Sequence, residues 1–313
     1  MKVIKKLMQI ALAIFFFGLL ATSTVLADDA DSEGWQFVQE NGRTYYKKGD
    51  IKEKAWRVID GKTYYFDHVS GEMVVGWQYI PFPSKGSTIG PYPNGLRLES
   101  MPMPQWYYFG KDGGLQEFVG KQVLEAKTAT NTNKHHGEQY DSPAEKRVYY
   151  FEDQRSYHTL KTGWIYDEGH WYYLQKDGNF DARIDSLTVG ELVRGWTNDN
   201  STWYYLDPTT GIMQTGWQYL GNKWYYLRSS GAMATGWYQD GSTWYYLDEQ
   251  NGDMKTGWQY LGNKWYYLRS SGAVATGWFQ VGSKWYYAYS SGDLAVNTTV
   301  DGYYVNYNGE WVQ

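Results

Sequence analysis

The feature that most constrains this chain is a Gly-Trp pair followed seven residues later by Trp-Tyr-Tyr, repeated at a nearly fixed period. The five regular pairs run from Gly195-Trp196 to Gly277-Trp278, and their tryptophans are 21, 20, 21 and 20 residues apart. So short a period predicts an array of stacked units, each packed on its neighbours, and argues against one globular core.

Within one repeat, residues 215–234, the sequence predicts a β-hairpin followed by a loop. Residues 217–220 and 223–227 are β-prone, and Gly221-Asn222 between them suits the positive φ angles of a tight hairpin turn. A second turn signal, Ser229-Ser230-Gly231, begins the loop to the next repeat. An isolated hairpin is marginal in water, so the fold expected is an all-β solenoid of stacked hairpins.

The N-terminus and the composition indicate a secreted protein. Residues 1–27 combine three lysines, an apolar run and a small-residue cleavage site, which predicts a signal peptide and no membrane span after its removal. Loss of those lysines changes the formal net charge from −5 to −8, which disfavours nucleic-acid binding. The chain has no cysteine, so disulfides cannot stabilise it, and no covalent wall-sorting signal is visible at its end.

The mature chain is expected to divide into residues 28–160, with degenerate repeats, and residues 161–313, with regular ones. The first part contains a Pro/Gly-rich insertion before Trp106 and a polar insertion from Gly120 to Lys146. Thr44, Thr63 and Val148 stand where the second tryptophan of a repeat is expected. We therefore expect these units to fold as hairpins but to lack a complete aromatic site.

The aromatic residues exceed what thin hairpins can bury. The chain has 17 tryptophans and 32 tyrosines, and ring faces left between successive hairpins can form cages. Two or three facing rings attract a quaternary ammonium, each by roughly 0.5–2 kcal/mol. Three rings give about millimolar affinity, which repetition along a polymer can raise by about 10²–10⁴-fold.

The elements Thr-Gly-Trp, Trp-Tyr-Tyr-Leu and Gly-Ala-Met-Ala of residues 215–234 resemble the choline-binding repeats of Gram-positive surface proteins. The resemblance covers most of the mature chain. It implies a left-handed β-hairpin solenoid that binds phosphocholine on teichoic and lipoteichoic acids. It also implies sites shared between consecutive repeats, each with two tryptophans of one unit, an aromatic residue of the next, and a nearby Met or Leu.

Carried onto this chain, the resemblance predicts five regular choline sites, and the aromatic residues of a sixth also match. The sixth, Trp164, Trp171 and Tyr204, is interrupted by the insertion 181–193. The regular sites are Trp196, Trp203, Tyr225 and Met213; Trp217, Trp224, Tyr245 and Met233; Trp237, Trp244, Tyr266 and Met254; Trp258, Trp265 and Tyr286, with Val274 in place of Met; and Trp278, Trp285 and Tyr303, with Leu294.

The sequence favours a non-catalytic wall-bound protein without a cofactor. There is no cysteine nucleophile and no His-Glu-x-x-His motif, and the non-repeat stretches are too short for a hydrolase domain. His135, His136 and Glu138 are a candidate metal cluster, although a solvated loop is the stronger expectation. Paired glycosidase carboxylates remain open, because they are recognised only in space.

Three roles follow from these expectations. The first is a surface protein, held non-covalently by choline, that modulates choline-anchored murein hydrolases. The second is an adhesin that uses its N-terminal part on a host ligand. The third is a glucan-binding module, whose repeats are also rich in Tyr, Trp and Gly.

Overall fold

The computed structural model describes residues 34–81, 104–136, 145–152, 158–176 and 187–312, and the backbone of residues 24–25. Every regular element in these ranges is a β-strand, which confirms the predicted all-β class. The predicted signal peptide lies outside the described residues apart from strand β1 (Thr24–Val25). No helix in the described ranges is both long and apolar enough to cross a membrane.

The chain separates into two compact units. Unit 1 consists of Met1–Thr162 and Lys176–Glu191, and unit 2 of Gly163–Gln175 and Leu192–Gln313. The division between degenerate and regular repeats at residues 160 and 161 stays a prediction. Residues 187–191 belong to unit 1, where Val189 joins a buried cluster with Trp77 and Tyr149, although they follow the first hairpin of unit 2 in the chain.

The described residues of unit 1 form four sheets. Its strands are β1, β2 (Gln36–Glu40), β3 (Arg43–Lys48) and β4 (Ile51–Lys52) in one sheet; β5 (Ala55–Ile59) and β6 (Lys62–Phe66) in the second; β10 (Lys134–His135), β7 (Val74–Pro81) and β8 (Pro104–Phe109) in the third; and β9 (Gly120–Glu125) with β11 (Lys146–Phe151) in the fourth. Aromatic side chains fill the interior, and Trp56, Trp77 and Tyr107 are at most 1 % exposed.

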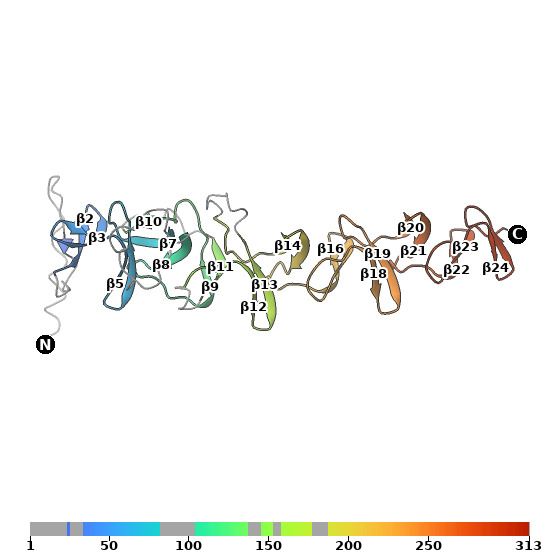
Figure 1. Ribbon diagram of the computed structural model, residues 1–313, viewed down its shortest axis with the longest axis horizontal. Coiled ribbons are helices and arrows are strands. Elements are labelled where there is room, and N and C mark those ends of the chain that lie inside the picture. Colours follow the sequence, from blue (N-terminus) through green and yellow to red (C-terminus); the bar gives the residue numbers. More distant parts are fainter. Residues whose placement is uncertain are drawn as a thin grey trace, which may run out of the picture. The chain divides into compact units, whose positions relative to one another are not determined.

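Unit 2 is a row of antiparallel hairpins. In chain order they are β12 (Gly163–Asp167) with β13 (His170–Leu174), β14 (Gly195–Asp199) with β15 (Thr202–Leu206), β16 (Gly216–Leu220) with β17 (Lys223–Leu227), β18 (Gly236–Asp240) with β19 (Thr243–Leu247), β20 (Gly257–Leu261) with β21 (Lys264–Leu268), β22 (Gly277–Val281) with β23 (Lys284–Ala288), and β24 (Thr298–Val300) with β25 (Tyr303–Val305). Successive hairpins of this unit point in different directions around the row (Figure 1).

The local sequence explains each hairpin. Gly221 and Asn222 have φ angles of 54° and 64°, as predicted for a turn that matches the right-handed twist of the strands. The chain then pairs Trp217 with Tyr226 across the two strands. The last strand residue, Leu227, is fully buried and forms a β-bridge to Met233 in the following loop. Equivalent leucines make a narrow interior, which leaves most ring faces at the surface.

Ion pairs join the turn of one hairpin to the loop after the next. Lys264 Nζ lies 2.9 Å from a carboxylate oxygen of Asp293, and Lys223 Nζ lies 3.3 Å from Asp253. The hydrogen bond to Asp293 raises the pKa of Lys264 above its ordinary value. These contacts reinforce the stacking of hairpins that the short repeat period requires.

Candidate functional site

The register of each hairpin brings its two tryptophans to one face. In the third hairpin Trp217 lies opposite Tyr226, so Trp224, two residues before Tyr226, projects from the same face. The intervening Tyr225 projects from the other face, toward the preceding hairpin. Each tryptophan pair therefore meets the first tyrosine of the following Trp-Tyr-Tyr.

Trp217, Trp224 and Tyr245 show the geometry of the resulting cage. The ring centroids of Trp217 and Trp224 are 6.4 Å apart with an interplanar angle of 82°. Those of Trp217 and Tyr245 are 4.8 Å apart at 62°. Rings set nearly at right angles present more than one π-face to the same space, which suits a compact organic cation. The cavity that they line with Met254 has a volume of about 310 Å³.

Five further cages in unit 2 repeat the contact between the first tryptophan and the tyrosine, and each is named here for its first tryptophan. The two tryptophans lie 6.5, 6.5 and 6.4 Å apart in the Trp196, Trp237 and Trp258 cages. The distance from the first tryptophan to the tyrosine is 4.6 Å in the Trp164 cage, 5.0 Å in the Trp196 cage, 4.8 Å in the Trp237 and Trp258 cages, and 5.7 Å in the Trp278 cage. The structure thus groups the aromatic residues as the sequence predicted. It also brings Trp164 and Tyr204 together despite the insertion between them.

The predicted fourth residue of each cage was wrong by one repeat. Met254, not Met233, lines the Trp217 cage, because its backbone N–H donates a 2.8 Å hydrogen bond to the carbonyl oxygen of Trp224. The same bond runs from the loop residue to the second tryptophan throughout unit 2. It assigns Met213 to Trp171, Met233 to Trp203, Val274 to Trp244, Leu294 to Trp265 and Trp311 to Trp285.

The terminal cage is completed differently from the others. Trp311 joins Trp278, Trp285 and Tyr303 around one cavity, whereas Leu294 was expected there. The centroids of Tyr303 and Trp311 are 5.8 Å apart at 86°. The end of the chain therefore supplies a fourth ring where a regular repeat supplies Met, Leu or Val.

The second tryptophan of each cage in unit 2 is accessible from solvent. These residues, Trp171, Trp203, Trp224, Trp244, Trp265 and Trp285, are 41–46 % exposed. A ligand can therefore reach the ring without prior opening of a hairpin. The exposure also means that the rings are not required to fill the interior.

Polar groups surround the Trp237 cage. Arg269, Ser290 and Ser291 line the same cavity as Trp237 and Trp244. The rings would hold an organic cation, and the guanidinium and hydroxyl groups would face an attached anionic group. In the Trp217 cage, the Trp217 indole N–H donates a 3.0 Å hydrogen bond to the Asp240 carboxylate, which adds negative charge beside the rings.

The first hairpins of unit 1 have no open cage. Thr63 occupies the place of the second tryptophan, and Trp56 is 1 % exposed because Tyr107 packs against it at 4.9 Å. The carbonyl oxygen of Thr44 accepts a hydrogen bond from the backbone N–H of Met73. In the cages of unit 2 the carbonyl oxygen of the second tryptophan accepts the equivalent bond. The threonines thus preserve the stacking contact while removing a ring.

Sequence reasoning missed one complete set of rings in unit 1. Trp77, Trp106 and Tyr149 have the same relation as Trp217, Trp224 and Tyr245, although a long insertion separates β7 from β8. All three are buried, at 1 %, 6 % and 0 % exposure. The Gly76-Trp77 pair could have indicated a cage. It was missed because Trp106 does not follow Trp77 at the seven-residue spacing of the regular repeats.

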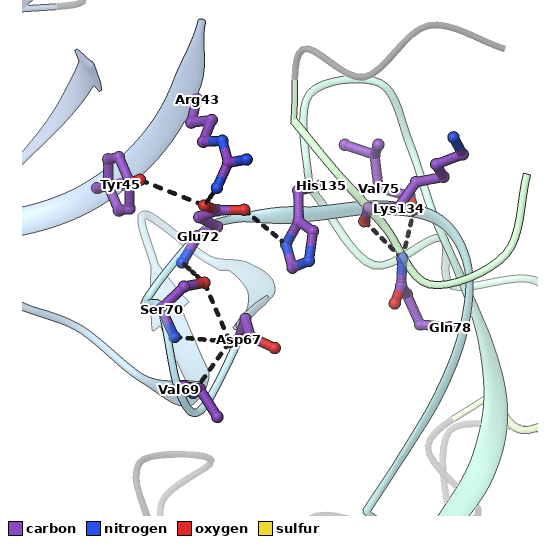
Figure 2. Close-up of polar contacts among 10 residues, drawn as sticks. All are labelled: Arg43, Tyr45, Asp67, Val69, Ser70, Glu72, Val75, Gln78, Lys134 and His135. Carbon is purple, nitrogen blue, oxygen red and sulfur yellow. Dashed lines mark hydrogen bonds and ion pairs between the residues drawn. The ribbon is translucent and has the colours of Figure 1, made fainter. Parts of the chain in front are cut away.

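Of the candidate metal residues, His135 joins a polar cluster centred on Glu72 (Figure 2). The Glu72 carboxylate pairs with Arg43 and lies 3.3 Å from Nδ1 of His135. His136 instead contacts the Thr44 hydroxyl at 2.6 Å. The two histidines therefore diverge to tie the inserted segment to earlier hairpins. Glu138 lies outside the described residues, within which no three His, Asp or Glu side chains converge as a metal site.

The chain is similar to known families of repeats and to solved structures. Residues 214–256 and 255–298 match the choline-binding repeat family, and residues 104–115, 162–180 and 195–213 match a cell wall binding repeat. CbpJ from Streptococcus pneumoniae TIGR4 is 66 % identical, with a TM-score of 0.72 over 89 % of this chain and 100 % of that one.

Choline binding protein F from Streptococcus pneumoniae, solved in the presence of a peptidoglycan analogue, is 55 % identical. Its TM-score is 0.70, and the match covers 90 % of this chain and 100 % of that chain. A search of curated protein sequences returned no match.

Proposed function

Because this chain belongs to the choline-binding proteins, we propose that unit 2 binds phosphocholine of teichoic and lipoteichoic acids through its aromatic cages. The observation that carries this proposal is the repeated set of perpendicular rings, with the second tryptophan of each set 41–46 % exposed. Rings of this kind attract a trimethylammonium group by roughly 0.5–2 kcal/mol each.

Repetition makes weak cages sufficient for attachment to a wall. One cage of three rings corresponds to about millimolar affinity, whereas several cages on one polymer gain about 10²–10⁴-fold. The protein would then stay on the cell surface without a covalent anchor. Choline bound to a polymer and choline free in solution would compete for the same rings.

The test is retention on a resin that carries choline, followed by elution with free choline. We expect the protein to be retained and to elute as choline fills the cages. Choline-decorated walls should bind it and walls lacking choline should not. Equal binding to both kinds of wall, or retention unaffected by excess choline, would reject the proposal.

We further propose that the wall-bound protein is non-catalytic and modulates choline-anchored murein hydrolases. Competition between this protein and the hydrolases is expected, because two proteins with choline-binding cages bind the same phosphocholine groups of the wall. The structure of choline binding protein F in the presence of a tetrasaccharide-pentapeptide is consistent with a glycan contact in addition. Purified protein added to labelled walls should release no label alone and should change release by a choline-binding hydrolase. Release of label by the protein alone would show that it is an enzyme. Unchanged hydrolase activity at saturating protein would reject modulation and favour the role as an adhesin.

A further inference from the structure

The ring set of Trp77, Trp106 and Tyr149 in unit 1 reproduces the cages of unit 2. The centroids of Trp77 and Trp106 are 6.3 Å apart at 85°, and those of Trp77 and Tyr149 are 4.7 Å apart at 56°. The backbone N–H of Leu160 donates to the carbonyl oxygen of Trp106 at 3.3 Å, as the loop residue does in every cage of unit 2. The geometry is therefore that of a cation site.

A lysine of the same chain occupies this site. The Lys127 ammonium lies 4.7 Å from the ring centroid of Trp77, 5.3 Å from that of Trp106 and 4.4 Å from that of Tyr149. It also donates a 2.6 Å hydrogen bond to the carbonyl oxygen of Val189. Lys127 is 3 % exposed, so its charge faces the rings and not the solvent.

The inserted segment between β9 and β10 places this lysine. Strand β9 pairs with β11, which carries Tyr149, and β10 pairs with β7, which carries Trp77. The Trp77 indole N–H donates to the carbonyl oxygen of Glu125 at 2.8 Å, two residues before Lys127. Backbone contacts on both sides thus hold the segment with Lys127 directed at the rings.

The site compensates a buried charge in three ways. The ring faces attract the ammonium, and the Val189 carbonyl accepts a hydrogen bond from it. The Glu191 carboxylate lies nearby, where it accepts a 3.2 Å hydrogen bond from the Tyr149 hydroxyl. Arg147 Nε lies 3.4 Å from the other oxygen of Glu191 and shares its charge. A lysine packed only for its methylene groups would need none of these partners.

We propose that Lys127 is a built-in ligand of a choline-type cage, which fills the cage, excludes free choline from it and ties the inserted segment to the hairpins of unit 1. Removal of the side chain beyond Cβ opens a site for a small alkylammonium ion. The idea rests on the proposed function only through the likeness to the cages of unit 2. Its test uses neither walls nor retention, so the two can fail separately.

The test is rescue of the full-length Lys127→Ala protein by n-propylammonium, which matches the atoms that this substitution removes. Unfolding by urea is followed at pH 6, where the buried Lys127 amine keeps its proton, with n-propylammonium chloride or with sodium chloride at equal ionic strength. At ten times its dissociation constant, a ligand raises the folded-to-unfolded ratio about elevenfold. We expect this gain in Lys127→Ala beyond any gain in the wild type, which shares the cages of unit 2.

Two controls separate a cation site from a filled cavity. Lys127→Met keeps the space filled without charge and should gain no more than the wild type, and neutral n-propanol should not rescue Lys127→Ala. Equal stabilisation of Lys127→Ala and Lys127→Met by n-propylammonium would overturn the proposal.

If Lys127→Ala does not fold, NMR of the wild type decides. One lysine ε-methylene signal, absent from Lys127→Met, should be shifted upfield by the rings. Lysine signals all at their free positions would overturn the proposal as well.

Discussion

The backbone N–H of Met254 donates a 2.8 Å hydrogen bond to the carbonyl oxygen of Trp224, although a whole hairpin lies between the two residues in the chain. The loop that follows each hairpin therefore closes the cage of the hairpin before it. This relation makes every cage of unit 2 depend on correct stacking of its neighbours.

The Met254→Ala substitution should weaken the Trp217 cage and spare the Trp237 cage. Met254 lines the first of these cavities, and Val274 lines the second. Loss of part of one apolar wall costs about 1 kcal/mol, which is about fivefold in affinity. Choline titrations followed at the indole N–H signals of Trp217 and Trp237 resolve the two sites. If choline affinity fell only at Trp237, Met254 would belong to the Trp237 cage, as the sequence predicted.

Removal of an exposed ring should abolish one cage without unfolding the protein. Trp224→Ala should raise the choline dissociation constant reported by the Trp217 indole about tenfold or more, because a ring worth roughly 0.5–2 kcal/mol and its apolar contact are lost. Tyr219→Ala is the matched control, since Tyr219 packs on Trp224 at 5.1 Å but does not line the cavity. Equal effects of both substitutions would contradict this cage, provided that urea unfolding shows both proteins intact.

Gly252→Ala should destabilise the protein more than Gly241→Ala. Both glycines have positive φ angles, of 75° and 60°, so each substitution costs about 1–2 kcal/mol in backbone strain. A Cβ at Gly252 would lie 2.4 Å from Sδ of Met233, whereas one at Gly241 would meet nothing within 4 Å. Overpacking adds about 1–3 kcal/mol for Gly252→Ala alone. Urea unfolding measures both changes, and equal losses would show that the loop does not press on Met233.

Arg269→Gln should lower affinity for phosphocholine, but not for choline, at the Trp237 cage. Arg269 lines that cavity beside the rings, where it can meet the phosphate of a ligand whose cation is held by them. A solvent-exposed ion pair contributes about 0.2–1 kcal/mol, so we expect up to about a fivefold loss. The Trp237 indole signal reports each titration, and choline is the internal control. A parallel loss for both ligands would indicate damage to the rings.

The stability of the protein should rise between pH 7 and pH 9 through Lys127. Burial lowers the pKa of Lys127 to about 7 from its ordinary 10.5, with Glu191 acting in the opposite direction. In this window the unfolded chain binds the proton that the folded chain has released, so the free energy of unfolding increases with pH, by at most about 1.4 kcal/mol per unit. Below pH 7 both states carry the proton and the slope vanishes.

Comparison with Lys127→Met isolates this slope, because the other titrating groups, including Glu191, Tyr149 and Arg147, are shared. The wild type should gain stability relative to the variant from pH 7 to pH 9. Parallel pH profiles would mean that the rings and the Val189 carbonyl keep the buried Lys127 amine protonated up to pH 9.

The sequence predicted the hairpins and the aromatic members of the cages because both depend on local rules. Gly221-Asn222 fixes a tight turn, and the alternation of a strand fixes the face from which Trp224 projects. The period then places Tyr245 against Trp217, since one repeat can only pack on the next. Such features need no knowledge of distant contacts.

The Met assignments failed because proximity along the chain was mistaken for proximity in space. Met233 follows Trp224 closely in sequence, but the loop turns back to bond Trp203 of the preceding hairpin. The shift of one repeat between the predicted and the observed loop residue depends on how far each hairpin rotates relative to its neighbour. The residue pattern within one repeat does not predict that rotation.

The order of residues is enough to predict the repeat, with its hairpins, its turns and the rings at its surface. The loop that closes each cage, and the filling of the Trp77 cage by Lys127, depend on contacts between residues far apart in the chain. The physical reason is the range of the interactions. Turn angles and strand alternation act within a few residues, whereas Lys127 reaches its rings only after β9 and β10 have paired with strands far away in the chain.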